Sequence, residues 1–209
     1  MRILGVDPGS RLTGYGCVDW VGNRLVHVAH GTLRLANTSG KATVPLEERL
    51  LLLHQGLSQV IQELRPEVLA IERVFFAKNA VSALKLGQAR GAAILTGMIH
   101  SVKIVEYSAT EVKLAVVGHG QAGKEQVAKM VTLLTGCKDF ETADASDGLA
   151  LAICHAHSTR ALVSSGSDYA RALQGISRGK RGRSGSLAEA LGFSPSGKGI
   201  NRGIPRSSK

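Results

Sequence analysis

Four acidic residues occupy positions from which their side chains could meet. Asp7 is the first polar residue after an apolar run, and Glu72 ends the apolar run Val-Leu-Ala-Ile. Asp144 and Asp147 are three residues apart, which places them on neighbouring positions of one helical face. Each residue alone is typical of a turn, a cap or a partner of the helix dipole. Two carboxylates on one face repel each other, so the pair favours a site for a divalent cation.

Carboxylate oxygens are the hard ligands that Mg²⁺ and Mn²⁺ prefer. Two such ions about 3.5–4 Å apart activate a water and stabilise the leaving oxygen in phosphodiester hydrolysis. We therefore expect Mg²⁺, as two ions per site, with Mn²⁺ as the alternative ion. The chemistry of the four residues favours a nuclease.

The elements that would carry these carboxylates follow from apolar spacing and turn signals. Three short strands joined by tight turns predict an antiparallel meander, and the later strands are separated by helices and should be parallel. Pro45 and Arg65-Pro66 bound the first helix. The expected fold class is α/β, with a mixed five-stranded sheet and helices on both faces. The predicted strands are 2–7, 13–20, 24–35, 68–72 and 104–107, and the predicted helices are 46–64, 78–100, 110–117, 124–134 and 142–157.

Length and composition limit the class of protein. The chain has 209 residues, of which 44% are hydrophobic, enough for one domain with a sizeable core but short for two. Apolar runs are too short for a membrane span, and the N-terminus turns polar too soon for a signal peptide. We expect a cytoplasmic protein. Cys17, Cys137 and Cys154 lack the CxxC spacing of a disulfide framework or zinc site, so reduced, structural thiols are expected.

The positive charge is concentrated at the C-terminus. Residues 158–209 contain 10 Lys and Arg against 2 Asp and Glu, out of a formal net charge of +10 for the chain. The same stretch has 11 Ser and 9 Gly, a composition that buries too little apolar surface to offset its ordering entropy. We expect a nuclease domain over 1–157 and a disordered basic tail over 158–209. The tail would attract a polyanion such as DNA in a salt-dependent way, or act as a solubilising end with nonspecific attraction alone.

Four segments together resemble a known family. ILGVDPGSRLTGYG, AIERVFFAKNAVSALKLGQARG, VKLAVVGHGQAGKEQV and DASDGLALAICHAH are similar in order and sequence to the RuvC family of Holliday junction resolvases. The resemblance covers about residues 1–157. It implies an RNase H-like fold, a homodimer, and symmetric Mg²⁺-dependent nicking of four-way DNA junctions in recombination and repair. It also implies the RuvA-RuvB branch-migration complex as a partner.

The resemblance assigns roles to individual residues. Asp7, Glu72, Asp144 and Asp147 match the family's metal-binding catalytic carboxylates. Phe75 matches an aromatic that stacks on bases, although its neighbour Phe76 is a rival and one of the two is expected to face the core. The remaining DNA-binding residues implied are Lys78, Lys113 and Lys124, and those implied at the dimer interface are Leu84, Gly87, Gly91, Ile94 and Met98.

Two departures from the family pattern carry expectations of their own. Gly148 stands where the family usually has Ala, and it is expected to hold Asp147 less firmly. The tail is longer than the family's usual C-terminus. Within the chain, the helix cost of Gly87 and Gly91 predicts a close approach, either to a second copy or to the chain's own sheet.

Other readings of the sequence remain open. Residues 118–125 resemble a Walker A loop, but Glu125 stands where a Ser or Thr should be. The hairpin after Asp7 could cradle a phosphate in an actin-like or sugar-kinase fold, although the chain has no second lobe. A YqgF-type RNase H-like nuclease acting on RNA and a nonenzymatic basic nucleic-acid-binding protein are further alternatives. Cys154, His155 and His157 could suggest a metal cluster, but their spacing points them to different sides of a helix.

Overall fold

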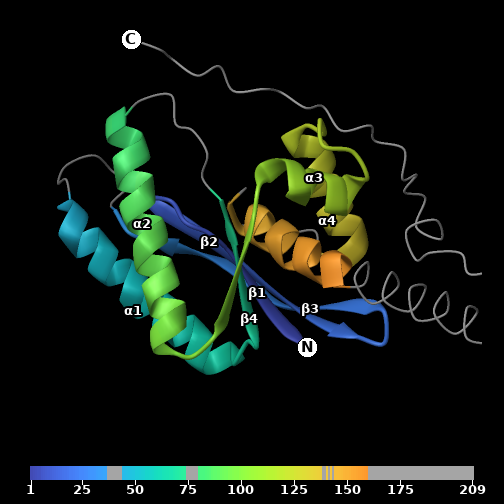
Figure 1. Ribbon diagram of the computed structural model, residues 1–209, viewed down its shortest axis with the longest axis horizontal. Coiled ribbons are helices and arrows are strands. Elements are labelled where there is room, and N and C mark those ends of the chain that lie inside the picture. Colours follow the sequence, from blue (N-terminus) through green and yellow to red (C-terminus); the bar gives the residue numbers. More distant parts are fainter. Residues whose placement is uncertain (37–43, 74–79, 138–139, 141, 143, 160–209) are drawn as a thin grey trace, which may run out of the picture. The chain divides into compact units, whose positions relative to one another are not determined.

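The computed structural model describes residues 1–36, 44–73, 80–137, 140, 142 and 144–159 (Figure 1). Its strands are β1 (Arg2–Asp7), β2 (Leu12–Val21), β3 (Arg24–Arg34), β4 (Val68–Glu72) and β5 (Lys103–Tyr107). The first four helices are α1 (Leu46–Leu64), α2 (Ala80–Ile99), α3 (Ala109–Val117) and α4 (Lys124–Thr135). A further helix spans residues 144–159.

The sheet has the predicted mixed topology. Its strand order is β3-β2-β1-β4-β5. The pairs β1–β2 and β2–β3 are antiparallel, whereas β1–β4 and β4–β5 are parallel. The expected class, α/β with a five-stranded sheet of the RNase H-like kind, is confirmed.

Local signals explain most element boundaries. Gly22 and Asn23 have φ values of 53° and 68°, as the tight β2–β3 turn requires. Pro45 precedes α1, and Arg65 ends it in the left-handed conformation with φ 49°. Ser108 and Glu111 form a reciprocal capping box that starts α3. The predicted boundaries differ from the observed ones by at most two residues. Residues 78 and 79, where α2 was predicted to begin, and residues 143 and 160, which flank the last helix, lie outside the described part.

The helices cover both faces of the sheet (Figure 1). On one face, Leu4, Val6, Leu69 and Ile71 join a core with α1 and α2. On the other face, Ile3, Val18 and Ala70 join a core with α3, α4 and the 144–159 helix. Within the described residues, no helix combines the length and apolar character needed to cross a membrane. The predicted tail lies outside the described residues from 160 onward, whereas its first two residues, 158 and 159, are helical.

Candidate active site

Asp7 and Glu72 lie side by side at one end of the sheet. The last aligned pair between the parallel strands β1 and β4 is Val6 with Ile71, so the next residue of each strand is the carboxylate. Side chains alternate along a strand. Because Val6 and Ile71 belong to the core under α1 and α2, Asp7 and Glu72 project toward the opposite face, where the 144–159 helix lies.

That helix brings the remaining two carboxylates to the same place. Asp144 and Asp147 lie in its first turn, and carboxylate oxygens of Asp7, Asp144 and Asp147 all lie within 4.8 Å of one another. Glu72 is outside this triplet but lines the same cavity as Asp7 and Asp147. The four predicted carboxylates therefore converge from two strands and one helix.

Glycines allow the helix to lie directly on the sheet. A Cβ atom added to Gly148 would come within 2.6 Å of the Tyr15 carbonyl carbon and 2.7 Å of the Gly16 nitrogen. A Cβ added to Gly16 would lie 2.5 Å from the Leu149 nitrogen, and one added to Gly14 would collide with the Asp144 backbone. Gly148 was expected to hold Asp147 less firmly. Its packing brings the first turn of the helix into backbone contact with β2, and how firmly Asp147 is held stays a prediction.

Burial and mutual repulsion make the carboxylates reluctant to ionise together. Burial, followed by the charges of Glu72, Asp147 and Asp144, raises the pKa of Asp7 to about 7. Burial also raises the pKa values of Glu72 and Asp147, against the opposing effect of the Lys124 ammonium. A divalent cation would relieve this repulsion while accepting oxygen ligands. The donor set thus fits Mg²⁺ or Mn²⁺.

The cavity beside the carboxylates is small and has a basic rim. Its volume is about 150 Å³, and its walls include Asp7, Glu72, Asp147, Lys113 and Lys124. Pockets that enclose drug-sized ligands measure roughly 300–1,000 Å³, so this cavity suits ions, water and one phosphate group rather than a whole nucleotide. A polymeric substrate would lie across its mouth.

Of the predicted DNA-binding residues, two are placed at the site. The Lys124 ammonium lies 3.6 Å from an Asp147 carboxylate oxygen, and Lys113 of α3 lines the same cavity. Phe75, its rival Phe76 and Lys78 lie outside the described residues. Helices α3 and α4 thus present two lysines toward the four carboxylates.

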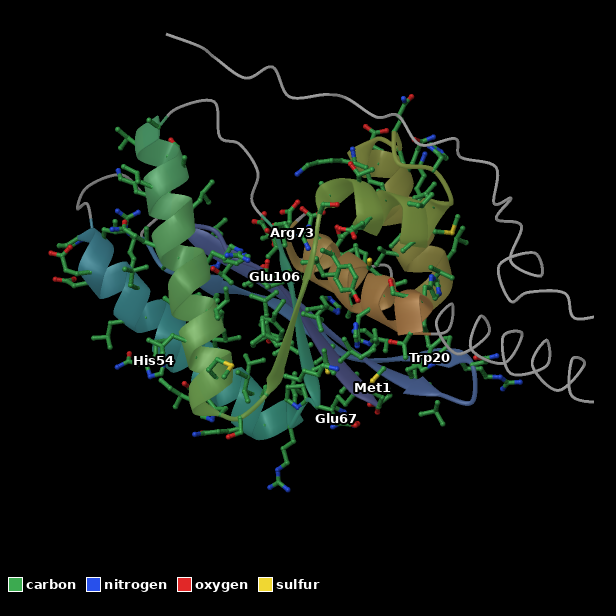
Figure 2. All side chains as sticks on the ribbon, in the orientation of Figure 1. Met1, Trp20, His54, Glu67, Arg73 and Glu106 are labelled. Carbon is green, nitrogen blue, oxygen red and sulfur yellow. The ribbon has the colours of Figure 1, made fainter. Side chains whose placement is uncertain are left out.

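Arg90 is a site residue that sequence reasoning missed. Its Nε donates a hydrogen bond of 3.0 Å to the Glu72 carbonyl oxygen, and its guanidinium lies 2.6 Å from a Glu106 oxygen. Arg73, which follows β4, reaches Glu106 of the neighbouring strand β5 at 3.7 Å, and Figure 2 shows these two residues close together. Arg90 thereby fixes the backbone that carries Glu72. The sequence signal that could have identified Arg90 is its position in the segment AIERVFFAKNAVSALKLGQARG, which resembles the family.

Most of the predicted interface residues form an open stripe on α2. Leu84 and Met98 are 69% and 60% exposed. A Cβ atom added to Gly87 or Gly91 would meet no atom of the described residues within 4 Å, so the alternative that these glycines pack against the chain's own sheet is wrong. Ile94 differs from the others because it is half-buried against the core under α1 and α2.

Two competing motifs have other structural roles. The stretch that resembles a Walker A loop connects helix α3 to helix α4, whereas a phosphate-binding P-loop follows a strand. The His155 ring contacts the Tyr107 hydroxyl at 2.7 Å, and the His157 ring contacts the Ala115 carbonyl at 2.8 Å. These histidines therefore point to different partners, as their helical spacing predicted.

Comparison with known proteins identifies relatives along most of the described chain. The family model "Crossover junction endodeoxyribonuclease RuvC" matches residues 3–155. The chain is 52% identical over 157 residues to the protein of that name from Syntrophotalea carbinolica, covering 75% of this chain and 94% of the relative. It is 53% identical over 158 residues to that from Geobacter sulfurreducens, covering 76% and 93%.

Solved structures agree with the sequence comparison. Thermus thermophilus RuvC in complex with a Holliday junction substrate matches with a TM-score of 0.69 and 31% identity, covering 77% of this chain and 95% of that one. The yeast mitochondrial Holliday junction resolvase Ydc2 matches with a TM-score of 0.52 at 15% identity, covering 74% and 78%. The second likeness supports the fold alone.

Proposed function

Because the chain belongs to the RuvC family of crossover junction endodeoxyribonucleases, we propose that it resolves four-way DNA junctions by metal-dependent hydrolysis of phosphodiester bonds. The observation that carries the proposal is the convergence of Asp7, Asp144 and Asp147 within 4.8 Å, with Glu72 beside them. An RNA-directed nuclease of the YqgF type would share the carboxylates, but the relatives at about half identity carry the junction endonuclease name.

The four carboxylates are proposed to hold Mg²⁺, as two ions per site. When bound, Mg²⁺ supplies an activated water and charge stabilisation for the phosphate and the leaving oxygen. The protein's part is to fix the ligands. Arg90 holds the backbone at Glu72, and the glycine contacts hold the helix of Asp144 and Asp147 against the sheet.

The basic side chains are proposed to bind the substrate backbone. Lys113 and Lys124 line the cavity rim, where an ammonium group attracts a phosphate and partly offsets the carboxylate charge. Phe75 and Lys78, next to Glu72 in the sequence, are proposed as further DNA contacts. The tail from residue 158 is proposed to add sequence-independent attraction.

Resolution of a junction requires opposed nicks in two strands, and one carboxylate cluster cuts one strand. We propose that two copies associate through α2, whose exposed Leu84, Gly87, Gly91 and Met98 support such a contact. An isologous dimer would relate two clusters by the two-fold axis of the junction. Association with a RuvA-RuvB branch-migration complex and a cytoplasmic location stay predictions.

The experiment compares substrates and one matched pair of variants. Purified protein is incubated with a synthetic four-way junction, a duplex or an RNA/DNA hybrid, with and without Mg²⁺. We expect Mg²⁺-dependent cutting of the junction at two opposed sites. Glu72→Gln should lower the cutting rate about 10²–10⁴-fold, because a metal contributes several kcal/mol to the transition state. Glu48→Gln, an exposed position on α1, is the control and should cut normally.

Binding measurements separate the catalytic role from a structural one. Glu72→Gln, Asp144→Asn, Asp7→Asn and Asp147→Asn should each keep junction binding, because basic side chains and protein shape supply it. Unfolding together with loss of binding would make these carboxylates structural. Preferential cutting of the RNA/DNA hybrid would favour the RNA-directed alternative.

A further inference from the structure

A second group of metal-ligating side chains lies away from the carboxylates. His27 and His30 belong to the edge strand β3, and Cys137 follows α4. One donor atom from each residue lies within 4.8 Å of the other two. All three side chains are half-buried. The sequence argued against a cysteine-based metal site because no two cysteines have a local ligand spacing, whereas folding brings Cys137 to the two histidines.

A β-bulge explains how the two histidines come together. Residues three apart on a regular strand point to opposite faces. Here Cys17 pairs with Ala29 and Val18 pairs with His27, so Val28 is an extra residue in β3. His30 pairs with Gly16. Because Gly16 and Val18 are two apart and share a face, their partners His30 and His27 share that face too.

The ring geometry is close to that of a metal site. The His27 Nε2 and His30 Nδ1 atoms lie 2.9 Å apart and share a hydrogen bond. Two imidazole nitrogens on one tetrahedral Zn²⁺ would lie roughly 3.3 Å apart, because each Zn–N bond is about 2.0–2.1 Å long. The separation is thus a few tenths of an ångström shorter than in a metal site, and binding an ion would also release the shared proton and turn both rings until their lone pairs meet at the ion. The Phe140 ring, 5.2 Å from the His30 ring centre, supports the imidazole.

We propose that His27, His30 and Cys137 bind one Zn²⁺ ion. Two imidazoles and a thiolate are borderline-soft donors that suit zinc, whereas the all-oxygen carboxylate site suits Mg²⁺. Three protein ligands leave the fourth tetrahedral position to water. The two sites of the chain thus select different ions by donor chemistry.

The ion would link the edge strand β3 to the segment that precedes the 144–159 helix. Cys137 precedes Asp144 by seven residues in the sequence. The hydroxyls of Thr32 in β3 and Thr142 in that segment already share a hydrogen bond. A metal link from His27 and His30 to Cys137 would add a second tie between the same two parts of the chain. Its role is to stabilise the start of the helix, separately from hydrolysis.

The test uses Co²⁺ as a spectroscopic substitute for Zn²⁺ on the full chain, with Mg²⁺ in large excess to occupy the carboxylates. We expect one equivalent of Co²⁺ to bind, with a near-ultraviolet thiolate-to-cobalt band that Zn²⁺ abolishes by displacement. Cys17 and Cys154 are fully buried, whereas Cys137 lies with His27 and His30, so the thiolate ligand should come from Cys137. Zn²⁺ should also raise the melting temperature, because it binds the folded chain.

Variants assign the ligands. Cys137→Ser should remove the thiolate band and weaken Co²⁺ binding at least about tenfold, the lower end of what the loss of an outer-sphere partner costs. His27→Gln should weaken binding by a similar factor and serves as the second variant if Cys137→Ser unfolds. Cys154→Ala and His119→Gln are the controls and should bind like the wild type. Asp7→Asn should also leave the cobalt spectrum unchanged, because it removes a ligand of the other site.

Two results would overturn the proposal. One is a folded wild-type chain that shows no thiolate-to-cobalt band even when further Co²⁺ no longer changes the spectrum. The other is a folded Cys137→Ser or His27→Gln variant that binds Co²⁺ with unchanged affinity and spectrum.

Discussion

The glycines at the contact between β2 and the 144–159 helix have surroundings opposite to those of the glycines in α2. Gly14, Gly16 and Gly148 lie where an added Cβ atom would collide with backbone, whereas Gly87 and Gly91 face open space. Because the residues of the first group have no side chain, the 144–159 helix can pack directly on β2. The second group costs helix stability, roughly 1 kcal/mol per Gly relative to Ala, and no contact among the described residues offsets it. The same residue type therefore allows close packing beside the carboxylates in one region and lies on an exposed helix face in the other.

The backbone contact between the 144–159 helix and β2 should fix the positions of Asp144 and Asp147. Backbone atoms cannot move aside as a flexible side chain does, so the first turn of the 144–159 helix is tied to the sheet. Asp144 and Asp147 stay near Asp7 despite their mutual repulsion. On α2, by contrast, substitutions at the glycines should leave the chain's own fold intact and act through association.

Among the substitutions that test this comparison of glycines, Gly14→Ala should have the largest effect. The new methyl group would collide with the Asp144 backbone and push the start of the helix off the sheet. We expect cutting of the junction to fall about 10²-fold, as a misplacement of about 1 Å does at a reacting site. Overpacking should also lower the free energy of unfolding by about 1–3 kcal/mol. Single-turnover cleavage and denaturant unfolding measure the two effects.

Gly87→Ala is the matched control for Gly14→Ala. At protein concentrations too low for association, it should raise the free energy of unfolding by about 0.5–1 kcal/mol, because an exposed helical Gly gains from a methyl group. A similar decrease in the free energy of unfolding for Gly14→Ala and Gly87→Ala would contradict the difference between the two groups of glycines.

The second prediction concerns Gly91→Glu. In a dimer that associates through α2, this carboxylate would be buried without a partner, at a cost of several kcal/mol. We expect a folded monomer that binds the junction but makes paired nicks about tenfold more slowly. Analytical ultracentrifugation with and without junction DNA measures the association. Gln55→Glu, which adds the same charge at an exposed position of α1, should remain dimeric. A wild-type chain that stays monomeric at micromolar concentration with junction DNA would exclude the dimer.

The strands and the helix that carry the four carboxylates could be predicted from the sequence, whereas the contacts between these elements could not. Apolar runs ending at Asp7 and Glu72, and helical spacing of Asp144 and Asp147, were enough to place four carboxylates at one sheet edge. Parallel pairing of β1 and β4 in register made the strand-end residues neighbours. The apolar runs and the helical spacing are local patterns that a sequence displays directly, whereas the register of β1 with β4 comes from the structure.

Contacts between distant residues were not visible in the sequence. A Gly in a strand indicates a bulge or a close approach without naming the partner, so the contact of Gly16 with Gly148 could not be predicted. The bulge that aligns His27 with His30 depends on pairing with β2. Arg90 supports Glu72 only because α2 folds back over the end of β4. The structure was needed for each of these relationships.

The third prediction tests whether the tight contact holds the carboxylates together against their repulsion. Burial and the neighbouring carboxylates raise the pKa of Asp7 from 3.8 to about 7. The folded chain then binds this proton more tightly than the unfolded chain, so the stability it contributes is complete below about pH 4 and is lost as the pH rises through 7. Asp7→Asn removes this penalty. Without metal at pH 8, we expect Asp7→Asn to be more stable by about 1–3 kcal/mol, given about 1.4 kcal/mol per pKa unit and partial relaxation.

Thermal unfolding in a chelator at pH 5 and pH 8 measures the effect. The difference between Asp7→Asn and the wild type should shrink at pH 5 and when Mg²⁺ is added at pH 8. Equal stabilities at pH 8 would mean that the helix moves away and relieves the repulsion itself, which would contradict a rigid contact through the glycines.

The smallest expected effect is that of Lys124→Met. The ammonium lies 3.6 Å from an Asp147 oxygen, and it opposes the rise that burial imposes on the pKa values of Asp147 and Glu72. Its removal raises these pKa values, so metal binding needs a higher pH. Because the Lys124 side chain is 86% exposed and solvent screens its charge, we expect the acidic limb of the pH–rate profile to move only slightly toward higher pH. Lys103→Met at the far end of β5 should leave the profile unchanged, whereas a shift toward lower pH in Lys124→Met would contradict the assigned role.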